Sequence, residues 1–289
     1  MIDQLNQFFT RAEGLLARLE GIVPGASVPA PDWAAAAAFR WDHRQRILSP
    51  VANFQRIRLA DLLGIDDQKK RIQQNTKQFV AGGTANNVLL SGARGTGKSS
   101  LVKALLNEYA DAGLRVIQID KQGLTDLPAI VGLVEGRRER FILYCDDLSF
   151  NADEDGYQTL KAALDGDLVA FSDNLLIYAT SNRRHLMPDY MSDNLATRYD
   201  GDEIHPAESI EEKISLSERF GLWISFYPFS QDEYLTICEC WLQYHGWMQG
   251  MSDEVRRAAL QWSLSRGSRS GRVACQFAKD WCGQQAARN

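Results

Sequence analysis

The sequence lacks a basic excess, a membrane-length apolar run and a secretory leader. Its 32 lysines and arginines are outnumbered by 37 acidic residues, which gives a formal net charge of −5, whereas a protein that coats nucleic acid needs a basic surface. No stretch approaches the ~20 apolar residues of a membrane span, and no basic segment followed by an apolar one opens the chain. We therefore predict a cytoplasmic protein with no membrane partner, for which nucleic acid is a possible but less favoured partner.

A CxxC pair is also absent. The five cysteines are odd in number: Cys145, Cys238, Cys240, Cys275 and Cys282. This usage fits free thiols in a reducing compartment better than a disulfide framework. Cys238, Cys240 and the nearby His245 form an alternative metal-binding set, although their spacing matches no zinc pattern.

The N-terminal residues have the pattern of an amphipathic helix. Apolar residues from Ile2 to Leu19 recur at steps of mostly three and four, which predicts a helix over residues 2–22. Pro24, Gly25, Pro29 and Pro31 then end the helix and begin a linker. We assign residues 1–58 to an N-terminal helical region with its linker.

Residues 59–229 alternate between helical stretches and short apolar runs. The runs have the length of strands and occupy residues 87–91, 115–120, 141–146, 175–180 and 222–227. This alternation predicts a five-stranded parallel sheet with helices on both faces. No strand pattern follows Pro228, and helix starts at Ser230 or Asp232, at Ser252 and near Gly271 predict a small α-helical lid over residues 230–289.

A phosphate-binding loop follows the first of these strands. The pattern GxxxxGK[ST] is matched at all its fixed positions in the segment Gly92, Ala93, Arg94, Gly95, Thr96, Gly97, Lys98 and Ser99. Ser100 then continues into an amphipathic helix. Backbone N–H groups and the helix N-terminus would hold the phosphates of ATP, Lys98 would reach the β- and γ-phosphates, and Ser99 would bind Mg²⁺. The alternative is a plain glycine turn with Lys98 exposed.

Two carboxylates end the third predicted strand. Asp146 and Asp147 follow an apolar run, and the carboxyl end of a parallel strand points into the ligand crevice. Asp146 would hold Mg²⁺ through water, and Asp147 occupies the place of the glutamate that usually activates the attacking water. Because aspartate is one methylene shorter, the hydrolysis rate stays open. A helix-capping or solvated acidic pair is the alternative.

Asn182 ends the fourth predicted strand. An amide there can hydrogen-bond the γ-phosphate or the lytic water, although an ordinary asparagine turn is the alternative. The next two residues, Arg183 and Arg184, suit either a nucleic-acid or a subunit contact, and the sequence does not separate these two roles.

Together these motifs resemble the AAA+ superfamily of P-loop ATPases. The resemblance runs from about Leu59 to the C-terminus and includes Arg219-Phe220-Gly221 and Gly267-Ser268-Arg269. The segments Cys145–Phe150 and Ala179–Leu186, with Phe39–Trp41 and Asp61–Ile65, also resemble a bacterial group of predicted ATPases catalogued as domain of unknown function 815.

The resemblance implies further roles. Arg219 stands where AAA+ proteins donate an arginine to the γ-phosphate of the neighbouring subunit, although it could be a solvated surface cation. Arg269, or Arg272 in its place, resembles the lid arginine that senses nucleotide. Gly64 and Ile65 lie in a segment that resembles the adenine contact, with an ordinary strand or turn as the alternative.

The functional expectation is an oligomeric, ring-forming ATPase that uses Mg²⁺ and ATP to remodel an unidentified protein partner. Residues 121–126, where protein-threading AAA+ machines carry an aromatic pore loop, contain no aromatic side chain, which argues against an unfoldase. The alternatives are a slow ATP-dependent switch or adaptor module, and an ATPase resembling helicase loaders that acts with nucleic acid.

Overall fold

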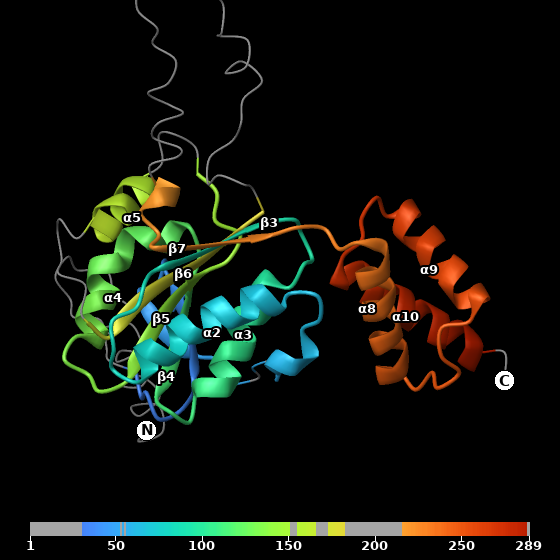
Figure 1. Ribbon diagram of the computed structural model, residues 1–289. Coiled ribbons are helices and arrows are strands. Elements are labelled where there is room, and N and C mark those ends of the chain that lie inside the picture. The colour runs from blue at the N-terminus through green and yellow to red at the C-terminus, as the bar shows by residue number, and fades with distance from the viewer. Residues whose placement is uncertain are drawn as a thin grey trace, which may run out of the picture.

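The computed structural model describes residues 31–52, 54, 56–150, 155–165, 173–182 and 216–287. The predicted helix over residues 2–22 and the arginines 183 and 184 lie outside these ranges. A central sheet is covered by helices on both faces, and a separate group of helices lies to one side (Figure 1). Among the described helices, none is both long and apolar enough to cross a lipid bilayer.

Within the described residues, the sheet has seven strands in the order β2-β1-β4-β5-β6-β3-β7. The five predicted strands are all present, as β3 (Val88–Gly92), β4 (Leu114–Ile119), β5 (Arg140–Cys145), β6 (Leu175–Ser181) and β7 (Leu222–Phe226). They pair in parallel throughout. The central strands are buried on both faces, which is why they read as continuous apolar runs.

Two strands were not predicted. Residues 38–50, assigned to the N-terminal linker, form the hairpin of β1 (Ala38–Asp42) and β2 (Ile47–Pro50), and β1 pairs in parallel with β4. Phe39 and Trp41 face the core while Arg40 is exposed, so the segment alternates as a half-buried strand does. The run is only five residues long, so its alternation is a weak sequence signal for a strand.

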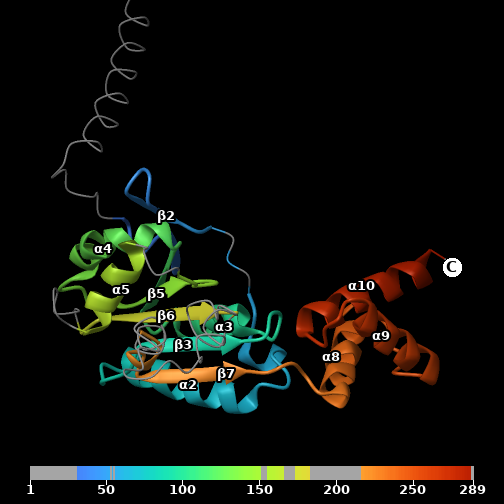
Figure 2. The same ribbon diagram turned by 90° about the horizontal axis from the view of Figure 1, so that it is seen from above.

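Helices pack on both faces because alternate strand residues point to opposite sides. One face, with Leu90, Tyr144 and Tyr178, packs against α2 (Asp66–Val80) and α3 (Lys98–Tyr109). The other, with Leu89 and Leu143, packs against α4 (Leu127–Val134) and α5 (Asp155–Asp165). Figure 2 shows the sheet between these two layers.

Short 3-10 turns connect some of these elements. η1 (Leu59–Asp61) precedes α2, and η2 (Gln122–Asp126) follows β4. Asp126 at the end of η2 accepts hydrogen bonds from the β1–β2 hairpin: Trp41 Nε1 lies 2.9 Å and His43 Nδ1 2.6 Å from Asp126 Oδ2. The hairpin therefore holds the segment that follows β4.

The predicted lid comprises α8 (Gln231–Tyr244), α9 (Asp253–Ser265) and α10 (Gly271–Ala286). Each begins at a serine whose Oγ accepts a backbone N–H three residues on: Ser230, Ser252 and Ser270. Such N-caps satisfy backbone donors that the first helical turn leaves unpaired. The lid core, around Tyr234, Ala259 and Phe277, is continuous with the core of the α/β domain.

A buried polar network links α2 to the sheet. The hydroxyl of Tyr178 lies 2.8 Å from Thr76 Oγ1 and accepts a hydrogen bond from Asn75 Nδ2 at 3.1 Å. We expect Tyr178→Phe to lower the free energy of unfolding by about 1–2 kcal/mol, because the two α2 side chains lose a buried partner. Urea unfolding of Tyr178→Phe beside Tyr227→Phe, whose ring is 69% exposed, would measure this. An equal effect in both variants would contradict the prediction.

Candidate functional site

The phosphate-binding loop joins β3 to α3 in the predicted strand–loop–helix order. Gly92, Gly95 and Gly97 adopt positive φ angles of 122°, 74° and 102°, which favour glycine. A Cβ on Gly92 would lie 1.9 Å from the carbonyl oxygen of Phe226, so the loop passes directly against β7. These glycines let the chain turn sharply into the N-terminus of α3.

Lys98 lies inside this loop and is nearly buried. Its ammonium donates hydrogen bonds to the carbonyl oxygens of Gly92 (2.8 Å) and Ala93 (2.7 Å) and to Asn182 Oδ1 (3.2 Å). Burial lowers the pKa of Lys98 to about 8, against the raising effect of the Asp147 and Asp146 carboxylates. The cation is thus pre-positioned by the loop and poorly solvated, which strengthens its attraction to an anionic ligand.

Asp146 lies at the carboxyl end of β5, opposite the first turn of α3. Its Oδ1 accepts hydrogen bonds from Ser99 Oγ at 2.7 Å and Thr180 Oγ1 at 2.6 Å. Burial alone would raise the pKa of Asp146, but hydrogen bonds from Thr180 and other hydroxyls outweigh it, so the pKa is lowered. Ser99 and an ionised Asp146 therefore present hard oxygen ligands next to the phosphate loop, which is the donor set that Mg²⁺ prefers.

Asn182 connects Lys98 to the second carboxylate. While its Oδ1 accepts from Lys98, its Nδ2 donates to Asp147 Oδ1. Asp147 has a left-handed backbone, with φ at 54°, which aspartate tolerates better than most residues; its N–H donates to Thr180 Oγ1 at 2.9 Å. The structure therefore brings together Lys98, Ser99, Asp146, Asp147 and Asn182, all named from the sequence.

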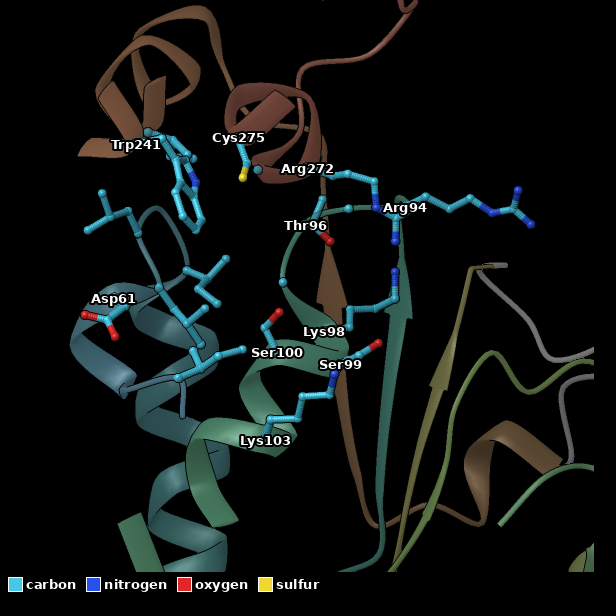
Figure 3. Close-up of a pocket in the computed structure, with 18 of the residues that line it drawn as sticks. Asp61, Arg94, Thr96, Lys98, Ser99, Ser100, Lys103, Trp241, Arg272 and Cys275 are labelled. Carbon is cyan, nitrogen blue, oxygen red and sulfur yellow. The ribbon is translucent and has the colours of Figure 1, made fainter. Parts of the chain in front are cut away.

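A cavity of about 1280 Å³ opens over this cluster and extends between the α/β domain and the lid. Figure 3 shows Lys98, Ser99 and Ser100 on one side of the cavity and Trp241 and Cys275 on the lid side. Arg94, Gly95, Thr96, Gly97 and Ile65 also line it. Gly64 is not a lining residue; it has a φ of 72° and packs against Phe229.

The two lid arginines differ in position. Arg272 lies in the first turn of α10 and lines the cavity, whereas Arg269 precedes the Ser270 N-cap and is not among the lining residues. The Arg269 carbonyl accepts a hydrogen bond from the backbone N–H of Phe229 at 3.2 Å. Arg272 is thus the arginine that faces the phosphate loop.

Sequence reasoning missed a group of cavity residues. They come from the segment before α2, from α3 and from the lid, and include Arg56, Arg58, Lys103, Cys240, Trp241, Tyr244, Cys275 and Lys279. Within the lid, the spacing of Cys240, Trp241 and Tyr244 on one face of α8 was visible in the sequence. Which face of α8 meets the cavity depends on how the lid packs, and the periodicity alone does not reveal it.

Arg219 lies away from this cavity, in the turn before β7. Its Nε forms an ion pair with Asp165 at the end of α5. Leu222 of β7 pairs with Val88 at the start of β3, whereas the phosphate loop leaves the other end of β3. The length of the strand therefore separates Arg219 from the phosphate loop of its own chain.

The alternative cysteine cluster is not assembled. Cys238 is buried in the lid core, whereas Cys240 is exposed and lines the cavity. Within the described ranges, no group of three or more histidine, cysteine or acidic residues is placed to hold a metal ion.

Comparison with known proteins identifies the family. A family model described as "Protein of unknown function (DUF815)" matches residues 34–285, most of the chain. The chain belongs to this family. A comparison of the DUF815 chain with curated protein sequences finds no match.

Solved structures identify the fold of this DUF815 member. A point variant of Thermotoga maritima RuvB aligns with a TM-score of 0.51 and 16% identity, and T. maritima RuvB itself, described as a Holliday junction branch migration motor, with 0.50 and 16%. Each match covers 78% of this chain and 65% of the RuvB chain. RuvB is an AAA+ ATPase, so the DUF815 chain has the AAA+ fold and spans about 65% of the length of these structures.

Proposed function

We propose that this protein binds ATP with Mg²⁺ and hydrolyses it to ADP and phosphate, as a ring-forming AAA+ ATPase that remodels a macromolecular partner. The observation that carries the proposal is the connected chain from Lys98 through Asn182 to Asp147, beside the Ser99–Asp146 pair. The Lys98 ammonium, the Asn182 amide and the two aspartate carboxylates lie together beside the glycine loop, whose backbone N–H groups can hold phosphate.

Each residue has a distinct task in this proposal. Lys98 exchanges its carbonyl partners for the β- and γ-phosphates, and Ser99 with Asp146 would hold Mg²⁺, which neutralises phosphate charge when bound. Once the γ-phosphate draws Lys98 away, Asn182 can orient the attacking water, and Asp147 accepts its proton. Arg272, on the lid side of the same cavity, reports whether the phosphates are present; Ile65 lines the part proposed for adenine.

The structure also offers one observation in favour of slow turnover. The Asn182 Nδ2 group donates a hydrogen bond to Asp147 Oδ1, so one oxygen of the proposed base already has a partner. The aspartate side chain is also one methylene shorter than the usual glutamate. A slow switch that selects a partner according to its bound nucleotide would need the same binding site. Steady-state phosphate release with ATP and Mg²⁺, alone and after chelation of Mg²⁺ by EDTA, distinguishes turnover from binding alone.

Nucleic acid is the less supported partner. The sequence has a cluster of arginines at positions 137, 138 and 140 that could contact nucleic acid. However, Arg137 pairs with Glu139 at 3.2 Å, and Arg140 donates to the Asp173 carbonyl at 2.7 Å and stacks over Phe79. Both side chains therefore contribute to the structure of their own chain. Arg183 and Arg184 lie outside the described residues.

We expect catalysis to depend on self-association, because Arg219 is placed away from its own phosphate loop. An arginine at the rim of β7 can serve the next copy in a head-to-tail ring, and a trans arginine contributes about 10³-fold or more in rate. Arg219→Ala should bind ATP like the parent and turn it over at least ~100-fold more slowly. Phosphate release and calorimetry measure the two quantities.

Mixing variants tests the contact itself. Lys98→Ala supplies an intact Arg219, and Arg219→Ala supplies an intact phosphate site, so a mixture should recover part of the activity that neither has alone. Arg137→Ala, which removes another ion-paired arginine, is the matched control. Activity per protomer that is constant on dilution to the monomer, with no recovery in the mixture, would contradict the trans role.

A further inference from the structure

Two tyrosines are neighbours on the sheet face that packs against α2 and α3. Tyr144 of β5 pairs with Tyr178 of β6, and both side chains are buried in the same core. The hydroxyl of Tyr178 has two partners on α2, Thr76 and Asn75. The hydroxyl of Tyr144 is also buried, but it forms no hydrogen bond of ordinary geometry within the part of the chain that the structure describes. Packing of the core therefore explains the ring of Tyr144 but not its hydroxyl.

A buried hydroxyl without a partner is unfavourable. The group loses its hydrogen bonds to water and gains none from the protein. Tyr144 is only 4% exposed, so contact with bulk solvent does not offset this loss. Phenylalanine has nearly the same shape without the cost, and the same strand carries one at position 141. The hydroxyl is better explained by a task at a neighbouring group than by the stability of the core.

The neighbours of this hydroxyl are the residues proposed to hold Mg²⁺. Alternate residues of a strand point to the same side, so Tyr144 and Asp146 share the face that meets α3. Ser99 Oγ and Thr180 Oγ1 both donate to Asp146 Oδ1, at 2.7 and 2.6 Å. Burial raises the pKa of Tyr144, and the Asp146 carboxylate raises it further. The side chains of Ser99 and Thr180 lower that pKa, which places the phenol beside all three.

Among these neighbours, Asp146 is the acceptor that Tyr144 suits best. The phenol supplies one O–H donor, and a carboxylate accepts a stronger hydrogen bond than a hydroxyl does. Because the two groups are already close, a small adjustment of either side chain completes the bond. Hydrogen-bond partners of a metal-binding carboxylate fix its orientation and thereby raise its affinity for the ion.

We propose that Tyr144 is a positioning residue for Mg²⁺, whose hydroxyl donates to the Asp146 carboxylate and holds it in the orientation that binds the ion. Tyr144 does not line the cavity, so it acts on the ion only through Asp146. The inference rests on the proposed function, since it requires Mg²⁺ at the Ser99–Asp146 pair. It extends the site to a residue inside β5, one layer below the phosphate loop.

The test compares Tyr144→Phe with Tyr178→Phe, which removes the neighbouring hydroxyl from the same sheet face. Calorimetry measures the ATP affinity of each full-length protein at a fixed Mg²⁺ concentration and again in EDTA. We expect Tyr144→Phe to bind ATP in EDTA like the parent, and the gain in affinity that Mg²⁺ gives to shrink about tenfold, as for other hydrogen-bond partners of metal ligands. Urea unfolding without nucleotide should show no loss of stability, because the hydroxyl has no ordinary hydrogen bond to lose.

Tyr178→Phe should give the opposite pattern. It should unfold at lower urea concentration than the parent, because its hydroxyl has two partners, and its gain in ATP affinity from Mg²⁺ should equal that of the parent. An unchanged Mg²⁺ gain in Tyr144→Phe would overturn the proposal, whatever the stability of the variant. An equal loss of the gain in both variants would also overturn it, since a general effect of the core on the site would then be the cause.

Failure of the proposed function would give a different result. If the parent protein binds no ATP, or binds it equally well with Mg²⁺ and with EDTA, the nucleotide site or its metal is wrong, and the role of Tyr144 falls with it. If the parent shows a clear Mg²⁺ gain and Tyr144→Phe keeps it, ATP and Mg²⁺ binding stand, and only the role of Tyr144 is wrong.

Discussion

Lys98→Ala is expected to abolish measurable ATP binding. Lys98 is the cation that the loop itself positions, with its ammonium 2.8 Å from the Gly92 carbonyl oxygen and 2.7 Å from that of Ala93. Hydrogen bonds from a charged donor to phosphate contribute about 1.5–3 kcal/mol each, and the alanine would lose at least two of them. The loss in affinity should exceed ~100-fold, measured by calorimetry with Mg²⁺ present.

The control must separate a lost ligand contact from a lost fold. Lys98 also holds the loop through the two carbonyls and Asn182, so the variant is compared with the parent by circular dichroism and thermal unfolding. Lys77→Ala removes an exposed lysine of α2 that does not line the cavity, and it should bind ATP like the parent. Unchanged ATP affinity in a folded Lys98→Ala protein would rule out this nucleotide site.

Asp147→Asn is expected to separate binding from hydrolysis. The amide has nearly the same shape as the carboxylate but does not accept a proton from water, and general-base catalysis contributes about 10²–10⁴-fold. We expect turnover to fall at least ~100-fold, while ATP affinity changes little because Lys98 and Ser99 are untouched. Phosphate release at saturating ATP and calorimetry measure the two effects.

The same measurements show where the base lies if this prediction is wrong. Asp67→Asn changes an exposed carboxylate in the first turn of α2 and should leave turnover at the parental rate. If Asp147→Asn also keeps the parental rate, another group removes the proton. Asp146 would be the next residue to test, since it is the other carboxylate at the end of β5.

The sequence predicted the interior strands well and the edge poorly. β5 and β6 are buried on both faces and flanked by helices, so burial on both sides explains their continuous apolar runs. β2 at the sheet edge exposes Ile47, Ser49 and Pro50 and buries only Leu48. Short, half-exposed strands carry little apolar signal, and their pairing is decided by a distant partner.

For the site, local motifs gave the phosphate side, whereas on the lid side they named only Arg269 and Arg272 and did not choose between them. Lys98, Ser99 and Asp146 follow from strand ends and a glycine loop, which the chain specifies within a few residues. Arg272 and Trp241 face the cavity because the lid packs as it does, and that packing is tertiary. A local signal for Arg272 did exist: Ser270 is a strong N-cap residue, and it places Arg272 inside α10 and Arg269 before it.

The β1–β2 hairpin also protects the sheet from wrong association. β4 is strongly apolar, and without β1 its outer backbone groups would be an open template for pairing with another chain. The hairpin covers them and ends the sheet with a four-residue strand that terminates in Pro50, a residue that cannot donate to a further strand. The α/β unit therefore includes the hairpin and begins before Ala38, and a fragment starting at Leu59 would carry an aggregation-prone edge.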